Sequence, residues 1–338
     1  MKYKKTLPFL LTAVCLLFAA GLSACKRSDT IQKSGFFFDT IISITLYDSQ
    51  KTEELEHCFE LARMYEGYFS AKIADSDISK INHAAGKQVL VHKETIELIK
   101  LGLTYSKLSG GKFDLTIGKL TSLWDFHAKS PSLPDKKKLA EAVSTIDYRS
   151  VNINGEKVSL SNPKAAIDLG GIAKGYIADK MKGYLLSCGI ESGLINLGGN
   201  VLAIGEKQDG SAYTIGIQKP FDKTGAAIAS LKIKDQTVVT SGTYERYFEL
   251  NGTLYHHILD TRTGYPYDNG ICSVSIICDN SVDGDGLSTA CFALGLKDGM
   301  KLVESLDDTE AIFIMTDLSM HCSSGIGEKV AFQAIESE

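Results

Sequence analysis

The sequence lacks several features that would place it in a familiar class of protein. It contains no CxxC pair, so a zinc or redox motif of that spacing is not indicated. Neither the phosphate-binding GxxxxGK motif nor the dinucleotide-binding GxGxxG motif occurs. There is no excess of positive charge, because the formal net charge is −5, and a nucleic-acid partner is therefore not expected. After residue 20 there is no second long apolar run, so no later segment is expected to span a membrane.

The N-terminus has the layout of an export signal. Three lysines in the first five residues precede an apolar run at residues 7–20, which is too short for a stable membrane span. The following Leu-Ser-Ala-Cys25 resembles a bacterial lipobox, which would make Cys25 the lipidated N-terminus. A plain signal peptide with a chance cysteine is the alternative. We therefore expect a signal peptide at 1–24, a polar tether at 25–33 and a folded domain at 34–338, held outside the cytoplasm on a membrane through a lipid anchor.

The remaining chain alternates strand-like and helix-like segments without repeats or a clear linker. Because the alternation is not a strict β-α-β order, the sequence predicts an α+β fold. The six cysteines after Cys25 form no recognisable disulfide framework, and most are expected to be small core residues. The expected helices are 53–69, 95–109, 136–143, 172–186 and 285–296. The expected strands are 36–47, 214–218, 227–233, 238–240, 244–250, 254–259, 272–278 and a closing strand 311–315, with a hairpin at 151–159.

One segment near the C-terminus combines two hard oxygen donors. Asp285 and Thr289 are four residues apart, so in a helix that starts at Asp285 their side chains share one face. A carboxylate beside a hydroxyl suits Mg²⁺. The alternative is that Asp285 caps the helix while Thr289 faces solvent. This segment alone does not decide between the two.

A second segment joins an acidic residue, a glycine turn and a lysine at the start of a helix. Asp168 is followed by a double glycine ending at Gly171, and Lys174 comes three residues later. Free backbone amides at such a turn can bind phosphate, and a lysine adds positive charge. A tight turn with a solvated lysine is the alternative.

Two further segments contain candidate chemistry. His256 and His257 are neighbours in an apolar, strand-like segment, so only one of them can face a given site, where it could act as a general base. The other segment, 113–126, contains the only tryptophan, Trp124, and its aromatic area could either hold a planar ring or pack in a core.

Taken in order along the chain, six motifs resemble the ApbE family of FAD:protein FMN transferases. They are Phe113-Asp-Leu-Thr with Leu123-Trp, Asp168-Leu-Gly-Gly-Ile-Ala-Lys-Gly, Asn196-Leu-Gly-Gly, Thr240-Ser-Gly-x-Tyr-x-Arg-Tyr, His257-Ile-Leu-Asp-x-x-Thr-Gly-Tyr-Pro and Asp285-Gly-Leu-Ser-Thr-Ala. The resemblance extends over residues 34 to 335. It implies two intimately packed α+β lobes of mixed or antiparallel sheet with helices, and an FAD cleft between them.

The resemblance also implies a set of site residues. In this family a Mg²⁺ ion touches the pyrophosphate of FAD. By position, its implied ligands are Asp285, Ser288, Thr289 and the backbone carbonyl of Gly171. The implied catalytic residue is His257, with His256 pointing away. The implied flavin-nucleotide contacts are Phe38, Lys72, Phe113, Asp114, Leu115, Asp168, Lys174 and Leu259.

The implied reaction cleaves FAD, attaches FMN through a phosphoester bond to a Thr or Ser of an acceptor flavoprotein, such as a membrane electron-transfer subunit, and releases AMP. The sequence departs from the family pattern at Lys72, where an aromatic residue often stacks on the flavin, and at Phe38-Asp39-Thr40, where Met-Gly-Thr is common. An FAD pyrophosphatase that releases FMN and AMP is therefore one alternative. A non-catalytic FAD-binding lipoprotein is the other, but it would not need Asp285, Thr289 and His257. A two-lobed solute-binding lipoprotein is disfavoured by the order of strands and helices.

Overall fold

The structure, a computed structural model, describes residues 30–49 and 52–335. Its centre is an antiparallel sheet with the strand order β1-β2-β6-β7-β10-β13-β14-β15. The interior strand β13 is buried along its whole length, as its uninterrupted apolar and small residues require. These strands are β1 (Ile31–Phe37), β2 (Thr40–Leu46), β6 (Ser192–Leu197), β7 (Asn200–Gly205), β10 (Thr237–Gly242), β13 (Ile271–Cys278), β14 (Glu310–Met315) and β15 (Met320–Cys322).

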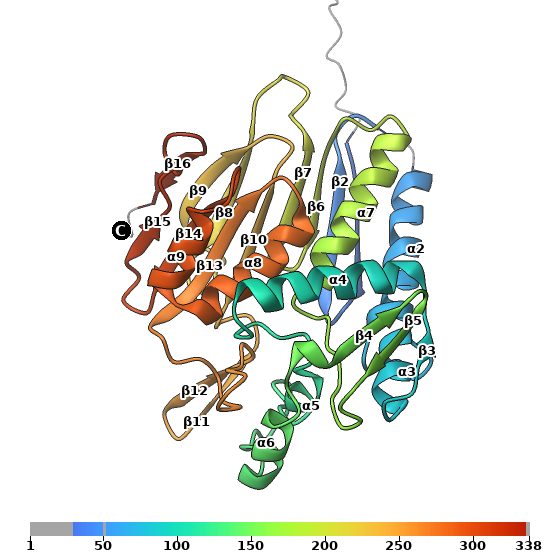
Figure 1. The fold of residues 1–338 in the computed structure, drawn as a ribbon. Coiled ribbons are helices and arrows are strands. Elements are labelled where there is room, and N and C mark those ends of the chain that lie inside the picture. The colour runs from blue at the N-terminus through green and yellow to red at the C-terminus, as the bar shows by residue number, and fades with distance from the viewer. Residues whose placement is uncertain (1–29, 50–51, 336–338) are drawn as a thin grey trace, which may run out of the picture.

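Helices cover one face of this sheet and form the main core (Figure 1). The helix α2 has a stripe of buried residues at helical spacing that includes Leu55, Phe59 and Ala62, and this stripe faces the sheet and helix α7. These helices are α2 (Thr52–Phe69), α4 (Lys93–Leu108), α7 (Ala173–Ser187), α8 (Ser281–Leu294) and α9 (Leu296–Val303).

A small second sheet forms another apolar core with part of the opposite face. Its strands are β8 (Tyr213–Gln218), β9 (Ala227–Ile233) and β16 (Ala331–Ala334), in the order β16-β9-β8. Its core includes residues from β7, β10, β13 and β14. No helix in the described part of the chain is both long and apolar enough to cross a membrane.

A smaller lobe lies below the large sheet in Figure 1. Trp124 lies in its small core beside Phe126 and Phe248, and its indole N–H donates to the Gly264 carbonyl at 3.1 Å. The aromatic area around Trp124 is therefore core packing. The elements of this lobe are α3 (Asp77–His83), α5 (Gly118–Thr121), α6 (Lys136–Val143), the 3₁₀ turn η1 (Tyr148–Ser150), the sheet β3 (Val89–Leu90), β5 (Lys157–Leu160), β4 (Val151–Asn154) and the hairpin β11 (Tyr247–Leu250), β12 (Thr253–His256).

The structure corrects several expected boundaries. The segment 36–47 is not one strand, because Phe38 and Asp39 both adopt positive φ angles and turn the chain between β1 and β2. Strand β1 begins at Ile31, so the last residues of the segment expected to be a tether, 31–33, belong to a strand. Strand β14 does not close the fold, because β15 and β16 follow it. The expected lipidation site Cys25 lies outside the described residues.

Candidate functional site

Helices α7 and α8 hold each other through two buried carboxylates. Asp285 on α8 accepts from the backbone N–H of Gly175 in the first turn of α7, at 2.9 Å. In return, Asp179 on α7 accepts from the backbone N–H groups of Ser281 and Val282 in the first turn of α8, both at 2.8 Å. Position 175 has no room for a Cβ against the Ser281 carbonyl, so only glycine allows this close approach. Each helix thus supplies the other with a capping anion.

This arrangement corrects the expected environment of Asp285. Helix α8 begins at Ser281, with Asn280 at the N-cap position, so Asp285 lies one turn inside the helix and is neither its first residue nor its cap. Burial raises the pKa of Asp285, while the charge of Lys174 and the α7 amides oppose that rise. Burial likewise raises the pKa of Asp179 to about 6, against the α8 amides.

The predicted metal ligands lie close together. The hydroxyl of Ser241, on β10, lies 2.8 Å from Ser288 Oγ and 3.1 Å from Thr289 Oγ1. A Cβ built on Gly171 would lie 3.8 Å from Thr289 Oγ1, which places the Gly171 loop beside Thr289. Ser288 is fully buried, and its hydroxyl also donates to the Asp285 carbonyl at 3.0 Å.

This donor set fits a hard divalent cation. In residues 30–49 and 52–335 no group of three or more His, Cys, Asp or Glu side chains could hold a metal ion. Among the predicted ligands Asp285 is the one carboxylate, and the other donors are hydroxyl and carbonyl oxygens; the carboxylate of Glu245 lies near enough for the charge of Asp285 to act on it. Such a set suits Mg²⁺ rather than a thiolate- or imidazole-seeking metal. Ser241 was not predicted as part of this set, although it stands in one of the six motifs.

Charged residues from other segments surround these oxygens. Lys174 Nζ donates to the Gly198 carbonyl at 3.4 Å, and its charge acts on both Asp285 and Glu245. Burial raises the pKa of Glu245, and the positive charges of Lys174 and Arg246 oppose the rise. Sequence reasoning missed Glu245 and Arg246, although both lie in the motif that begins at Thr240. Their place in that motif was their one sequence signal, because only the fold brings them near Asp285 and His257.

The two histidines have different surroundings, but the expected strand 254–259 does not contain both, because β12 ends at His256 and alternation along a strand does not set the direction of His257. His256 is buried, its Nε2 contacts the Tyr267 carbonyl at 2.9 Å, and its ring packs against Phe292. His257 lies beyond the end of β12 and faces Phe126. Its Nδ1 is buried with no hydrogen-bond partner among the described residues. Burial, with the charge of Arg246 next in importance, lowers the pKa of His257 to about 3, so its ring is neutral and has an acceptor to offer.

The predicted nucleotide contacts are only partly free to bind a ligand. Asp114 is buried, and it already accepts from Thr116 and from the Tyr148 backbone N–H at 2.7–2.9 Å. Asp168 accepts from the Gly170 N–H at 2.8 Å and from the Thr121 hydroxyl at 2.7 Å. The side chains of Phe113, Leu115 and Leu259 are buried in apolar cores. The three apolar residues can therefore contact a nucleotide only through their backbone or the edge of a side chain. The carboxylates of Asp114 and Asp168 mainly hold the loops that contain them.

Lys72 and Phe38 lie at the turn between β1 and β2. Lys72 is exposed, and its Nζ lies 2.5 Å from Asp39 Oδ2. The Phe38 N–H donates to Glu66 Oε1 at 2.8 Å. The Lys72 ammonium holds the pKa of Asp39 below its usual value, and the charges of Arg246 and His127 add to this effect. The turn therefore lies within electrostatic reach of the Arg246 side of the site.

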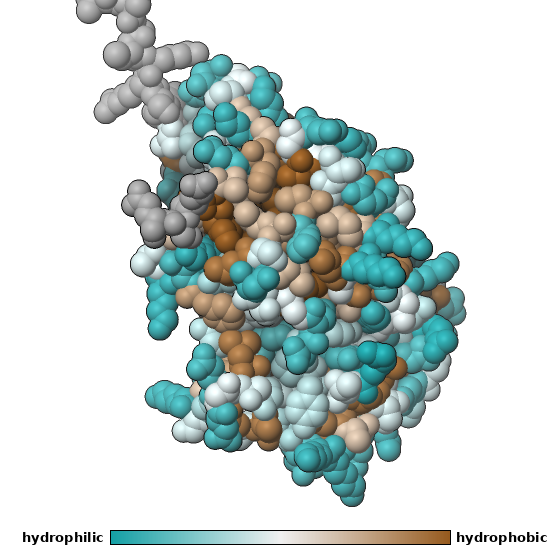
Figure 2. All heavy atoms as spheres, turned by 90° about the vertical axis from the view of Figure 1, so that its left-hand side faces the viewer, coloured by the Kyte–Doolittle hydropathy of each residue, from teal (hydrophilic) through white to brown (hydrophobic). Residues whose placement is uncertain are grey.

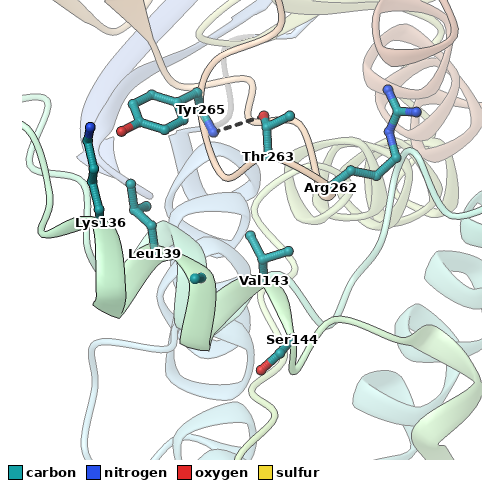
Figure 3. A pocket seen from close by; sticks show the side chains of 8 residues that line it. Lys136, Leu139, Val143, Ser144, Arg262, Thr263 and Tyr265 are labelled. Carbon is teal, nitrogen blue, oxygen red and sulfur yellow. Dashed lines mark hydrogen bonds between the residues drawn. The ribbon is translucent and has the colours of Figure 1, made fainter.

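Two surface hollows lie elsewhere. The larger, about 500 Å³, lies between α6 and the 262–265 loop, and Leu139, Val143 and Tyr265 line it (Figure 3). The smaller, about 270 Å³, includes Asp114 and Arg262. Neither includes Asp285, Thr289 or His257, so neither is the predicted metal and transfer site.

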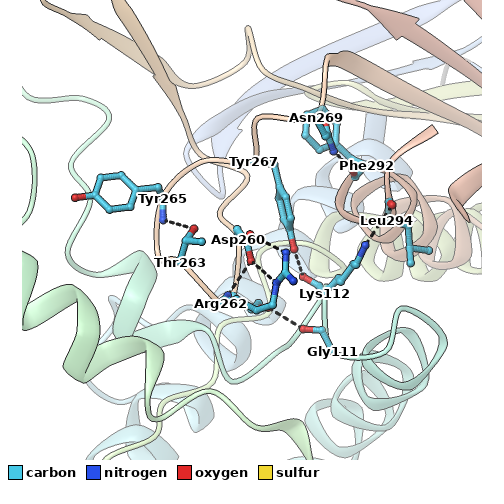
Figure 4. Close-up of polar contacts among 11 residues, drawn as sticks. Gly111, Lys112, Asp260, Arg262, Thr263, Tyr265, Tyr267, Asn269, Phe292 and Leu294 are labelled. Atoms are coloured by element: carbon cyan, nitrogen blue, oxygen red, sulfur yellow. Dashed lines mark hydrogen bonds and ion pairs between the residues drawn. The ribbon is translucent and has the colours of Figure 1, made fainter. Parts of the chain in front are cut away.

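Two segments, the loop after His257 and the loop that contains Lys112, hold the C-terminal end of α8 (Figure 4). Asn269 Nδ2 donates to the Phe292 carbonyl at 2.7 Å, and Lys112 Nζ donates to the Leu294 carbonyl at 3.3 Å. Tyr267 in turn donates to the Lys112 carbonyl at 3.1 Å. These contacts bind carbonyls in the last turn of the helix, where Phe292 also accepts from the Gly295 N–H, and they fix α8 at the end opposite Asp179.

The fold and the site define a two-lobed α+β protein in which oxygen donors, cations and one neutral histidine converge beside α7 and α8. The chain belongs to the ApbE family, whose sequence model matches residues 38–313. The predicted family and fold class are thereby confirmed. The roles of the individual site residues stay predictions.

Relatives and solved structures agree with this membership. The chain is 39% identical to the FAD:protein FMN transferase of Klebsiella pneumoniae, over 82% of this chain and 87% of the relative. It is 32% identical to that of Treponema pallidum, over 94% of this chain and 93% of the relative. The crystal structure of the ApbE protein from Thermotoga maritima is 32% identical and superposes with a TM-score of 0.80, over 87% of this chain and 97% of that one. The flavin transferase ApbE from Vibrio cholerae gives 26% identity and a TM-score of 0.77, with the same coverage.

Proposed function

We propose that this chain is a Mg²⁺-dependent FAD:protein FMN transferase that attaches FMN to a Thr or Ser of an acceptor flavoprotein and releases AMP. One observation carries the proposal: Asp285, Thr289 and the Gly171 loop meet beside Lys174, and the charge of Lys174 also reaches His257, whose Nδ1 has no hydrogen-bond partner among the described residues. The names of the relatives, FAD:protein FMN transferase, support the same reaction.

In this reaction the acceptor hydroxyl oxygen forms a bond to the FMN phosphorus, and the pyrophosphate bridge bond breaks. AMP leaves with the electron pair of that bond. Asp285, Thr289 and the Gly171 carbonyl would hold Mg²⁺, with Ser288 adjacent. When bound, the ion would neutralise charge on the pyrophosphate oxygens. Lys174 and Arg246 supply further positive charge for the same anion.

His257 would accept the hydroxyl proton at its free Nδ1. The positive charges of Arg246 and Lys174 contribute to its low pKa. A bound pyrophosphate would offset both charges, while burial would remain the largest cause of the low pKa of His257. The bound donor would therefore make proton transfer to His257 more favourable than it is without the donor.

The direct test combines the chain with FAD, Mg²⁺ and a purified flavodomain that has a single acceptor threonine. Mass analysis of the protein and chromatography of the nucleotides then follow both products. We expect an FMN adduct on the flavodomain and an equal amount of AMP. The two negative controls are a reaction with a chelator in place of Mg²⁺ and a reaction with a flavodomain whose acceptor threonine is replaced by valine. Intact FAD and unmodified flavodomain would show a binding protein instead.

FAD hydrolysis to FMN and AMP is a second candidate activity. The observation that favours it is Lys72, whose side chain is 76% exposed and paired with Asp39, so no aromatic ring covers the flavin from this position. Water could then replace the acceptor hydroxyl as the nucleophile. In the direct test, hydrolysis would give AMP in excess of flavinylated protein.

The site of action is also part of the proposal. The signal-like residues 1–24 and the lipobox-like Cys25 support a lipoprotein anchored on the outer side of the cytoplasmic membrane or at the cell surface. Cell fractionation of the wild type and of Cys25→Ser tests this, because only the wild type should stay with the membrane after a high-salt wash.

A further inference from the structure

Asn82, near the end of α3, binds the backbone of one distant residue with both polar atoms of its side-chain amide. Its Nδ2 donates to the Ile167 carbonyl at 2.9 Å, and its Oδ1 accepts from the Ile167 N–H at 2.7 Å. A carbonyl can only accept and a backbone N–H can only donate, so the two bonds fix the orientation of the amide. Asn82 therefore binds Ile167, which directly precedes Asp168, as a neighbouring strand would.

The segment around Ile167 is held on its other edge by the loop 115–118. Backbone hydrogen bonds of 2.8 and 2.9 Å join Asp168 and Ala166 to this loop. The polar groups of neighbouring residues in extended backbone point to opposite edges, so those of Ile167 face away from the loop. Asn82 occupies that opposite edge. The segment that leads into the Asp168 motif is thus fixed on both sides.

Helix α3 is a firm mount for Asn82. Ile81, next to Asn82, is buried in the main core. Asp77 in the first turn is also buried, and it accepts from the Thr95 hydroxyl at 2.6 Å, which joins α3 to α4. The hydrophobic surface in Figure 2 gathers over the upper half of the molecule, on the side of β15 and β16, whereas α3 lies on the other side in Figure 1. The role of Asn82 therefore follows from its internal contacts.

The segment that Asn82 holds leads directly to a proposed metal ligand. Gly171, whose carbonyl is that ligand, comes four residues after Ile167. Between them the chain turns tightly, because Asp168 Oδ1 accepts from the Gly170 N–H at 2.8 Å. A Cβ built on Gly171 would lie 3.8 Å from Thr289 Oγ1. A displacement of Ile167 would therefore be passed through this short turn to the Gly171 carbonyl.

We propose that Asn82 is a positioning residue for the metal-binding loop, because it fixes Ile167 and thereby the Gly171 carbonyl beside Asp285 and Thr289. This inference rests on the proposed function, since it concerns the Mg²⁺ that the proposed reaction uses. Asn82 acts through the backbone and is not itself a ligand. Its loss should weaken metal binding and leave the chemical step unchanged once the metal is saturating.

The test measures Mn²⁺ binding by the full-length chain with FAD present and the acceptor absent, from the EPR signal of free Mn²⁺. It compares the wild type with Asn82→Ala and Asn82→Asp. The aspartate variant keeps the shape and the acceptor for the Ile167 N–H but sets an oxygen against the Ile167 carbonyl, so it remains informative if the alanine variant folds poorly. We expect the Kd for Mn²⁺ to rise about 10–100-fold in both variants.

Activity gives a second readout. The Mg²⁺ concentration for half-maximal FMN transfer should rise by the same factor as the Kd for Mn²⁺, while kcat at saturating Mg²⁺ should match the wild type. The matched control is Asp48→Ala. Asp48 Oδ2 also accepts from two distant backbone N–H groups, those of Glu191 and Ser192 at 2.7 and 3.0 Å, but these follow the opposite end of α7 from Gly171. This variant should lower the melting temperature without changing the Kd for Mn²⁺.

The other outcomes decide against the positioning role. An unchanged Kd for Mn²⁺ in both Asn82 variants would overturn the proposal, and so would an equal rise in Asp48→Ala, because the effect would then follow from lost stability alone. A lower kcat at saturating Mg²⁺ with an unchanged Kd would also contradict it. If the wild type binds Mn²⁺ but transfers no FMN, the proposed function fails while the Kd values still decide the role of Asn82. If the wild type transfers FMN but binds no Mn²⁺, the positioning proposal alone fails.

Discussion

At the scale of single residues, Asp285 has two roles that can be separated. Its carboxylate caps α7 and, under the proposed function, holds the metal. Asp285→Asn keeps an acceptor for the Gly175 N–H but removes the charge, so we expect near-normal stability and at least about a hundredfold lower FAD cleavage. Asp285→Ala should also lose about 1 kcal/mol of helix capping. Thermal melts and FAD turnover across a Mg²⁺ series measure both effects. Normal turnover of Asp285→Asn at low Mg²⁺ would refute the metal assignment.

Substitution of the two histidines should affect different properties, namely FMN transfer for His257 and stability for His256. His257→Ala should bind FAD normally but transfer FMN about 10²–10⁴-fold more slowly, as expected for a lost general base. His256→Ala should mainly reduce stability, because His256 is buried and contacts the Tyr267 carbonyl. Equal losses of transfer per folded molecule in both variants would contradict this division.

The pKa of His257 adds a second readout for the same variant. Folding lowers this pKa to about 3, from an unfolded value of about 6.5. The stability that the neutral ring contributes is therefore fully present above pH 6.5 and is lost as the pH falls toward 3. His257→Ala should lose less stability than the wild type between pH 6.5 and pH 4, measured as the shift in denaturation midpoint.

Lys72 bears on how well the site excludes water. A flexible, hydrated ammonium paired with Asp39 seals a flavin face less well than a ring would. We expect slow Mg²⁺-dependent release of FMN and AMP from FAD without acceptor, and less release in Lys72→Tyr. Chromatography of FAD, FMN and AMP over time, with and without a chelator, follows this. An identical rate in Lys72→Tyr would show that water enters elsewhere.

At the scale of elements, α8 is held at both ends by side chains from other segments. Asp179 caps its first turn, while Lys112 and Asn269 bind its last carbonyls. Asp179→Ala should destabilise the protein by about 0.5–2 kcal/mol and raise the Mg²⁺ concentration needed for activity, because α8 carries Asp285 and Thr289. The neighbouring variant Lys180→Ala is the control, since the ion pair of Lys180 with Glu97 and its cation–π contact with Tyr176 do not involve α8. An unchanged Mg²⁺ requirement in Asp179→Ala would show that α8 is positioned without this cap.

Elements with a long amphipathic pattern could be predicted from the sequence, and those defined by tertiary contacts could not. The helices α2, α4, α6 and α7 lie within two residues of their expected bounds. The β1–β2 turn was missed because Phe38 and Asp39 occupy positive φ angles usually filled by glycine or asparagine. The early start of α8 was missed because its cap, Asp179, is about a hundred residues away in sequence. Glu245 and Arg246 were missed for a similar reason, since only the fold brings them to Asp285 and His257.

At the scale of the whole molecule, the hairpin β1–β2 lies between the first described residues and the site. The described chain enters β1 at Ile31, and in Figure 1 the blue hairpin runs from there down toward the smaller lobe. Seven residues of extended strand span about 23 Å. The turn at Asp39, and with it the Arg246 side of the site, thus lies a strand length from the point where the proposed tether joins the fold.

This geometry predicts how the proposed lipid anchor affects transfer. When an enzyme is anchored to the same membrane that holds its acceptor, the effective concentration of the acceptor around the enzyme is raised. Cys25→Ser should therefore lower the rate of transfer to an acceptor reconstituted in the same vesicles at least about tenfold. The kcat/KM for a soluble flavodomain should not change, because residues 30–49 and 52–335 contain every residue assigned to the site. Parallel assays with the two acceptors measure this. Equal rates for the membrane-embedded acceptor with and without Cys25 would show that anchoring does not assist transfer, and a loss with the soluble acceptor would show that residue 25 matters to the enzyme itself.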